Sequence, residues 1–258
     1  VGDSPEQLAE DARKRTNEGF TALRFSAFAP KFWLHRSYSE WANEALARVE
    51  AVRDTVGDDI DICVEIHREM NPAESIAFGR RLEALHPYFY EDPMLPDSPA
   101  LMADIKQLCN LPIATGERFT TIYEFQQLLE NRACAFVRPD LCLCGGLSGC
   151  KKVASMAEAH HVKVIPHNPL RPVSTAACVQ LDACIPNFAL QEYPTGEGRP
   201  PKSEIVTEPL KQEGGFLMIP DGPGIGVELA DGAETRFPPV AYGEIGARLG
   251  VDGSVVDQ

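Results

Sequence analysis

Short apolar segments that do not alternate between apolar and polar residues recur along the chain. Seven of them are rich in aliphatic and aromatic residues, at 21–28, 61–66, 87–91, 111–115, 134–138, 162–166 and 187–191. Strands buried on both faces of a parallel sheet have this character, because neither face meets water. Stretches long enough for a helix separate the seven segments. Strand and helix in alternation predict parallel βαβ units.

The same short pattern marks the expected start of several helices. Ser4 precedes Pro5, and Gln7 stands three residues after the serine. This order favours a helix N-terminus, because the serine side chain can accept a backbone hydrogen bond and the glutamine can return one. The pattern recurs, in whole or in its first half, at Ser37, Asn71, Ser98 and Thr121.

Ionisable side chains stand at the carboxyl ends of the predicted strands. Successive positions lie 23 to 27 residues apart, and they are Glu65, Glu91, Glu117, Asp140, His167 and Glu192. One strand–helix unit of a barrel takes roughly 30 residues, since about 250 residues form eight units. In a closed barrel these strand ends face one mouth, where barrel enzymes carry their chemistry. The series favours an α/β fold of the (β/α)8 TIM-barrel type over a doubly wound open sheet. No G-x-G-x-x-G motif follows a strand, which argues against the dinucleotide-binding form of the open sheet.

Three of these positions have the character of a metal site. Glu65, Glu91 and Glu117 would repel one another at a shared mouth unless a cation lay between them. Oxygen ligands suit Mg²⁺, and no cysteine or second histidine accompanies them at the spacing of a zinc site. His67 follows Glu65 by two residues, so in strand geometry it points to the same face.

Asp140 and His167 end consecutive predicted strands, which places them side by side. In this arrangement a carboxylate orients an imidazole and raises its basicity.

Charge and cysteine content narrow the class of protein. The chain has 258 residues, with 24 Lys and Arg against 38 Asp and Glu, a formal net charge of −14. That excess of acid argues against a nucleic-acid groove or an anionic membrane surface, and no apolar run approaches the roughly 20 residues of a membrane-spanning helix. The eight cysteines form no C-x-x-C pair, which favours reduced, partly buried thiols and a cytoplasmic protein.

Several motifs, in this order, resemble one enzyme family. They are VEIH (64–67), YEDP (90–93), ATGER (114–118), RPDL (138–141) with GG at 145–146, PHNPL (166–170) and LQEY (190–193), followed by DGPGIGVEL (221–229). From about residue 4 to about residue 230 the chain resembles the mandelate racemase/muconate lactonizing enzyme branch of the enolase superfamily. Within that branch it is similar to the galactonate dehydratase-like acid-sugar dehydratases.

The resemblance implies a role for each residue of the series. It makes Glu65, Glu91 and Glu117 the Mg²⁺ ligands. It makes His167, held by Asp140, the base that removes the proton next to the substrate carboxylate.

Two further roles and the reaction follow from the same resemblance. His67 would be the general acid on the departing hydroxyl, and Glu192 would hydrogen-bond the enediolate or the substrate carboxylate. The implied enzyme is a hydro-lyase that converts an aldonate to a 2-keto-3-deoxy acid. Its expected partners are a small sugar acid and further copies of itself, without nucleic acid or membrane.

The chain departs from the family pattern at two places. The first metal ligand is usually Asp, and here it is Glu65, whose extra methylene moves the carboxylate by roughly 1.5 Å, the length of a carbon–carbon bond. Relatives that racemise or lactonize carry a Lys-x-Lys base where this chain has Arg24, Phe25 and Ser26. Without that lysine, dehydration through His167 and His67 is favoured. A racemase or epimerase and a catalytically inactive barrel with a binding role stay open as alternatives.

Two more side chains are candidates for substrate binding. Arg24 could bind the substrate carboxylate or form a structural salt bridge. His35, in the loop after the first predicted strand, lies near the expected barrel mouth.

Seven strands are one fewer than a complete barrel needs, and relatives carry an N-terminal α+β capping domain and a first strand before this point. We therefore expect a modified, enolase-like barrel domain at 1–193 that lacks both. Residues 194–258 are rich in Pro and Gly, which predicts an irregular tail that packs outside the barrel, toward the missing cap.

Overall fold

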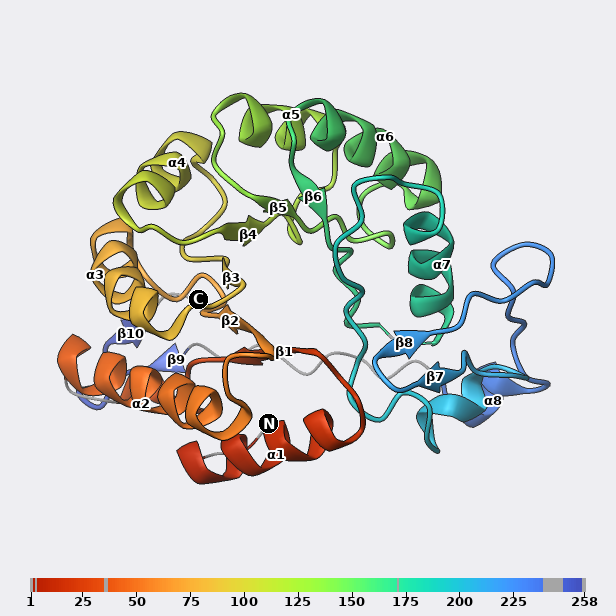
Figure 1. Ribbon diagram of the computed structural model, residues 1–258, viewed down its shortest axis with the longest axis horizontal. Coiled ribbons are helices and arrows are strands. Elements are labelled where there is room, and N and C mark those ends of the chain that lie inside the picture. Colours follow the sequence, from red (N-terminus) through yellow and green to blue (C-terminus); the bar gives the residue numbers. More distant parts are fainter. Residues whose placement is uncertain (1, 3, 35–36, 171, 239–247, 257–258) are drawn as a thin grey trace. The chain divides into compact units, whose positions relative to one another are not determined.

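The computed structural model describes residues 2, 4–34, 37–170, 172–238 and 248–256 (Figure 1). The chain forms two compact units. The first comprises Val1–Ala114 with Tyr242–Gln258, and the second comprises Thr115–Ala241. The expected division into a barrel domain at 1–193 and a tail at 194–258 stays a prediction.

Parallel strands in chain order form the centre of the first unit. They are β1 (Ala22–Ser26), β2 (Asp61–Glu65), β3 (Phe89–Glu91) and the first two residues of β4 (Ile113–Thr115). The register sets Ser26 opposite Glu65, and Glu65 opposite Glu91. Because neighbouring strands lie roughly 4.8 Å apart, polar side chains at these strand ends become neighbours.

Helices flank the strands of the first unit (Figure 1). They are α1 (Pro5–Asn17), α2 (Tyr38–Val56), α3 (Pro72–Leu82) and α4 (Pro99–Leu108), with 3-10 turns at Phe32–Leu34 and Glu83–Leu85. The expected helix starts are confirmed, because the side chains of Ser4, Ser37, Asn71 and Ser98 each accept a backbone N–H of the first turn. Two short antiparallel strands, β9 (Arg248–Leu249) and β10 (Val255–Val256), complete the unit.

The second unit continues the same alternation. The last residue of β4, Thr115, accepts the backbone N–H of Arg138 at 2.9 Å. Its strands β5 (Phe136–Val137) and β6 (Lys163–Val164) pair in parallel. The helices are α5 (Ile122–Glu130), α6 (Gly146–Ala159) and α7 (Pro172–Asp182). The predicted start of α5 is also confirmed, since the backbone N–H of Thr121 donates to Glu124 at 2.8 Å.

The seventh predicted strand, at 187–191, is reduced to a single parallel bridge between Val164 and Phe188. The backbone of Val164 bonds to Asn187 on one side and to Ala189 on the other. In a parallel ladder the next donor on this side would be residue 166. That residue is Pro166, which has no N–H, so the ladder ends there.

The remainder of the second unit is mostly irregular. It contains a 3-10 turn (Lys202–Ile205), an antiparallel pair β7 (Gln212–Glu213) and β8 (Phe216–Leu217), and the short helix α8 (Ala233–Arg236). An apolar cluster of Ala176, Val179 and Leu210 joins this part to α7.

Six of the eight cysteines are buried, and Cys142 and Cys184 are exposed. The burial agrees with the expected packing of several thiols as small apolar groups. Among the described helices, none combines the length and apolar character that a membrane crossing requires.

Candidate active site

Two buried carboxylates and one guanidinium meet at the carboxyl ends of β2 and β3. Glu65 and Glu91 are 5% and 0% exposed. Arg24, from the neighbouring strand β1, places Nη2 at 2.5 Å from Oε2 of Glu65 and Nε at 2.6 Å from Oε2 of Glu91. Of the two roles considered for Arg24, the salt bridge is therefore present in the structure.

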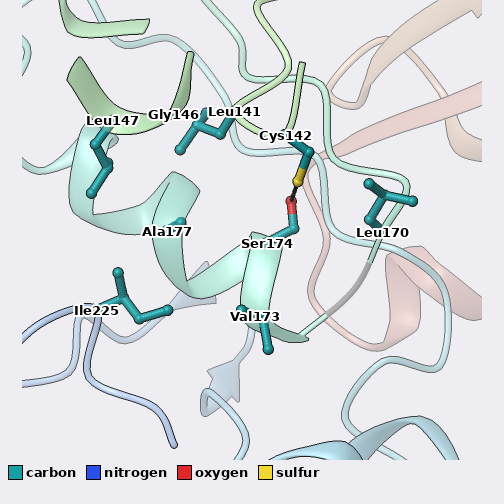
Figure 2. A pocket seen from close by; sticks show the side chains of 9 residues that line it. All are labelled: Leu141, Cys142, Gly146, Leu147, Leu170, Val173, Ser174, Ala177 and Ile225. Atoms are coloured by element: carbon teal, nitrogen blue, oxygen red, sulfur yellow. Dashed lines mark hydrogen bonds between the residues drawn. The ribbon is translucent and has the colours of Figure 1, made fainter. Parts of the chain in front are cut away.

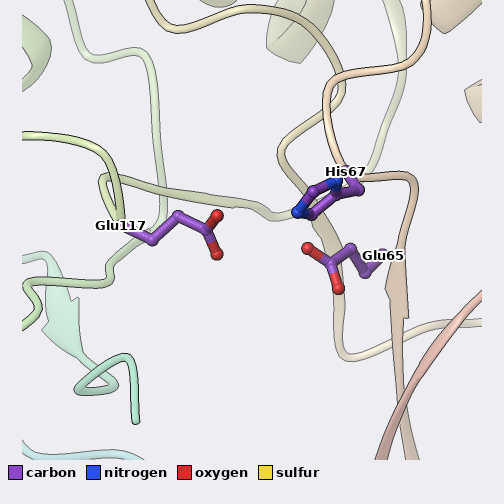
Figure 3. Close-up of side chains that lie close together, drawn as sticks. All are labelled: Glu65, His67 and Glu117. Atoms are coloured by element: carbon purple, nitrogen blue, oxygen red, sulfur yellow. The ribbon is translucent and has the colours of Figure 1, made fainter. Parts of the chain in front are cut away.

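The loop after β2 brings His67 to the same place. A ligand atom of the imidazole lies within 4.8 Å of a carboxylate oxygen of Glu65, and both side chains point to the same side of the strand end (Figure 3). The loop does this by a turn and not by continuing the strand, because His67 and Arg68 have φ angles of 50° and 68°. Arg68 stabilises the turn through its backbone N–H, 2.8 Å from the carbonyl of Asp92, and through Nη1, 2.7 Å from the Asp92 carboxylate.

Asp140 and His167 form a hydrogen-bonded pair in the second unit. A parallel bridge joins the two residues, and Nδ1 of His167 lies 2.8 Å from Oδ2 of Asp140. The other oxygen of the same carboxylate accepts the backbone N–H of Cys142 at 2.7 Å. Because a carboxylate only accepts, Nδ1 carries the hydrogen, and Nε2 is the nitrogen that can exchange a proton.

Glu117 lies on the other side of the same imidazole. Its Oε2 is 3.2 Å from Nε2 of His167, and Figure 3 shows its carboxylate extending from the segment after β4. The preceding residue, Gly116, has a φ of 122°, and a Cβ there would lie 2.7 Å from the ring of Phe125. Only glycine fits this turn without strain, so the turn that presents Glu117 depends on it.

Glu192 is held by a buried arginine. Its Oε2 lies 2.5 Å from Nη2 of Arg138 and accepts the backbone N–H of Asn168 at 3.0 Å. The Arg138 side chain is almost completely buried. Two donors on one oxygen fix the orientation of the carboxylate.

A chain of hydrogen bonds behind Glu192 was not foreseen from the sequence. Nδ2 of Asn168 donates to the Glu192 carbonyl at 3.0 Å and to Oγ1 of Thr175 at 2.7 Å. Thr175 in turn donates to the buried carboxylate of Glu197 at 2.7 Å. Arg138 could have been found, since it precedes Asp140 by two residues on an extended segment and so faces the same side. Nothing in the local pattern around Glu197 signals its contact.

The predicted residues are thus brought together within each unit. The first unit gathers Arg24, Glu65, His67 and Glu91, and the second gathers Glu117, Asp140, His167 and Glu192. His35 lies outside the described residues.

An apolar pocket of about 390 Å³ lies beside the Asp140 segment, between the starts of α6 and α7 (Figure 2). The exposed thiol of Cys142 faces Ser174 there, with Sγ 3.8 Å from Oγ. The other described residues that line it are apolar or glycine, so the described lining carries no charged group for a sugar acid.

The chain is similar to known proteins over most of its length. The profile of the family described as "Enolase C-terminal domain-like" matches residues 7–233. The chain is 35% identical over 225 residues to the D-gluconate dehydratase of Thermoproteus tenax, which covers 87% of this chain and 45% of that protein. It is 30% identical over 233 residues to the D-galactonate dehydratase of Verminephrobacter eiseniae, covering 88% and 60%. The chain thus spans about half the length of these curated relatives.

A solved structure gives the same result for the fold. The crystal structure of an enolase from Agrobacterium radiobacter, with bound sodium and L-malate, superposes with a TM-score of 0.87 at 30% identity. The match covers 98% of this chain and 68% of that one.

Proposed function

Because the chain belongs to the enolase C-terminal domain-like family and has its barrel-like fold, we propose that it is the catalytic part of a Mg²⁺-dependent acid-sugar dehydratase. The reaction would remove the proton next to the carboxylate of an aldonate and eliminate the β-hydroxyl, which gives a 2-keto-3-deoxy acid. The observation that carries the proposal is the Asp140–His167 pair, in which Nδ1 of the imidazole faces Asp140 and Nε2 lies 3.2 Å from Oε2 of Glu117.

The carboxylates of the site fit a hard divalent cation. Glu65, Glu91 and Glu117 are buried acids with oxygen donors, and Arg24 shows that two of them already face positive charge. We propose that these three residues hold Mg²⁺. When bound, the ion would act as a Lewis acid on the substrate carboxylate and so lower the energy of the negative charge formed on proton removal.

His167 has the arrangement of a general base. Asp140 holds the Nδ1 proton, so Nε2 is the atom that would take the proton from the substrate carbon. Asp140 would also stabilise the imidazolium that forms, because its charge lies 2.8 Å away.

We assign the remaining steps to His67 and Glu192. His67 is exposed at the end of β2 and would donate a proton to the departing hydroxyl, so that water leaves. Glu192, oriented by Arg138 and Asn168, would hydrogen-bond the substrate.

Arg24 favours dehydration over racemisation. A two-base racemase needs a second group that accepts a proton, and relatives with that activity have lysine at this strand end. A guanidinium stays protonated in proteins, and this one is paired with Glu65 and Glu91. Arg24 is therefore a poor second base.

The test is a panel of aldonates, including gluconate and galactonate, assayed with Mg²⁺ and with a chelator. We expect a 2-keto-3-deoxy product from at least one acid, lost on chelation and in His167→Asn. Exchange of the C2 proton with solvent deuterium without loss of water would instead indicate an epimerase. Absence of both product and exchange for every acid would rule out the proposed activity.

We further propose that the protein acts in the cytoplasm as a homo-oligomer. The support is the cysteine content and the family resemblance, and size-exclusion chromatography with light scattering tests the oligomer.

A further inference from the structure

The guanidinium of Arg24 lies against both of the proposed metal ligands of the first unit. Nη2 is 2.5 Å from Oε2 of Glu65 and 3.2 Å from Oε1 of Glu91, and Nε is 2.6 Å from Oε2 of Glu91. We propose that Arg24 is an internal counter-ion that a divalent cation must displace, so that Arg24 sets the affinity of the metal site. The inference rests on the metal site of the proposed function and deepens it.

The carboxylate pair needs a positive charge even without a metal. Glu65 and Glu91 are opposite each other in the register of β2 and β3, and both are buried. Two like charges this close and this poorly solvated destabilise each other strongly. A guanidinium with two parallel donors matches the geometry of carboxylates, and Arg24 takes this place.

The guanidinium and a divalent cation compete for the same oxygens. Both oxygens of Glu91 accept an N–H from Arg24, and Oε2 of Glu65 lies 2.5 Å from Nη2. A dication bound between the two carboxylates would lie within a few ångströms of the guanidinium, and that repulsion opposes binding. Binding of the ion therefore requires Arg24 to withdraw.

Arg24 has a route by which it can withdraw. Its side chain is 26% exposed, whereas those of Glu65 and Glu91 are 7% and 0% exposed. The nearby Arg68 forms an ion pair with Asp92. Arg24 is thus the member of the cluster with access to solvent, and the proposal has it withdraw while the buried carboxylates hold the metal.

Calorimetric titration of Mg²⁺ into chelator-treated protein tests the proposal. Arg24→Met keeps the length of the side chain and removes its charge, and we expect it to bind Mg²⁺ at least about tenfold more tightly than wild type. Arg13→Met is the matched control. This variant makes the same change in net charge. Among the described ion pairs Arg13 takes part only in the one with exposed Glu10 on α1, so its loss should leave the affinity for Mg²⁺ at the wild-type value.

Melting curves provide a second readout. Without metal, Arg24→Met should melt at a lower temperature than wild type, since the carboxylates lose their counter-ion. Mg²⁺ should then raise its melting temperature by more than it raises that of wild type. Equal Mg²⁺ affinity of wild type and Arg24→Met, or no binding by either, overturns the proposal.

A measurement on the wild-type protein covers the case in which Arg24→Met does not fold. The Nε–H proton of Arg24 is hydrogen-bonded at 2.6 Å, and its NMR signal can be identified by its loss in Arg24→Lys. Saturation with Mg²⁺ should shift this signal, and an unchanged signal overturns the proposal. None of these experiments uses a sugar acid. If Arg24→Met binds Mg²⁺ more tightly but no aldonate of the panel reacts, the proposed dehydratase activity is contradicted and the role of Arg24 as counter-ion is supported.

Discussion

The imidazole of His167 is hydrogen-bonded through Nδ1 to Oδ2 of Asp140, at 2.8 Å. The backbone N–H of Cys142 holds the second oxygen of the same carboxylate. The acid is thus fixed on both sides, and it fixes the tautomer of the histidine in turn.

Asp140→Asn should therefore reduce catalysis while leaving the fold intact. An amide can present either a donor or an acceptor to Nδ1, so the tautomer with a free Nε2 is no longer enforced. We expect kcat for the responsive aldonate to fall by roughly 10²–10⁴-fold, measured by steady-state kinetics with the far-ultraviolet CD spectrum as a check. His160→Gln is the control, because the His160 side chain hydrogen-bonds to the Met156 carbonyl near the end of α6 and to no other described residue. A wild-type kcat in Asp140→Asn would contradict the role of the pair.

Arg138→Met should lower the stability of the protein, because it removes the ion pair with Glu192. The side chain of Arg138 is buried, and its loss leaves the Glu192 carboxylate without its ion pair at 2.5 Å. We expect a loss of about 3 kcal/mol in the free energy of unfolding, measured by urea denaturation. The double variant Arg138→Met/Glu192→Gln should recover part of the loss. If the two single changes add without coupling, the ion pair does not act as a unit.

Gly116→Ala should destabilise the protein more than Gly57→Ala. Both glycines have positive φ, 122° and 72°, so alanine is strained at each. Only at Gly116 would the new methyl also meet a neighbour, the Phe125 ring at 2.7 Å, whereas nothing lies within 4 Å at Gly57. We expect Gly57→Ala to lower the free energy of unfolding by about 1 kcal/mol. Gly116→Ala should lower it by about 1–3 kcal/mol more, because the new methyl overpacks the site. Equal losses of stability in the two variants, measured by thermal denaturation, would show that the Phe125 ring can move aside without an energetic penalty.

Asp182→Asn should change how stability depends on pH. Burial raises the pKa of the Asp182 carboxyl from its usual value near 3.8 to about 8, and neither oxygen finds a hydrogen-bond partner among the described residues. Between these pH values the folded protein holds a proton that the unfolded chain does not. Unfolding releases that proton, so Asp182 makes stability fall as pH rises from about 4 to about 8, with a slope of up to about 1.4 kcal/mol per pH unit.

The asparagine variant lacks this contribution. Its free energy of unfolding should exceed that of wild type by the largest amount near pH 8, and this difference should shrink toward pH 4. Urea titrations at several pH values measure the difference. A difference that does not change with pH would mean that Asp182 titrates in the folded protein as it does in the unfolded chain.

Arg248→Met should loosen the loop that carries His67. Nη1 of Arg248 lies 2.7 and 2.8 Å from the two carboxylate oxygens of Glu69, and its guanidinium lies 4.5 Å from the centre of the Trp33 ring. Loss of these contacts should lower the local opening free energy by about 1 kcal/mol. Hydrogen exchange of residues 66–70 should accelerate, and Arg236→Met, which removes a comparable contact with Phe237, should leave that segment unchanged. Equal exchange in both variants would show that Arg248 does not restrain the loop.

The sequence predicted features that depend on neighbours in the chain. Six of the seven expected strands and the expected helix starts are present, because burial pattern and capping residues act within a few positions. The seventh strand was overestimated, since the apolar pattern at 187–191 does not report that its partner strand runs into Pro166. His67 reaches Glu65 by a left-handed turn, which the alternation of a strand could not indicate.

By itself the sequence also determined the order of the ionisable strand ends and the adjacency of Asp140 and His167, because parallel strands one unit apart bring their carboxyl ends together. Only the tertiary structure decided which side chains those groups face. Arg24 forms ion pairs with Glu65 and Glu91, and Arg138 forms one with Glu192. Thr175 donates a hydrogen bond to Glu197. Arg248 binds Glu69, which is 179 residues away in the chain. Such pairs depend on the paths of loops and on the rotamers that packing allows, and no local pattern of residues encodes either.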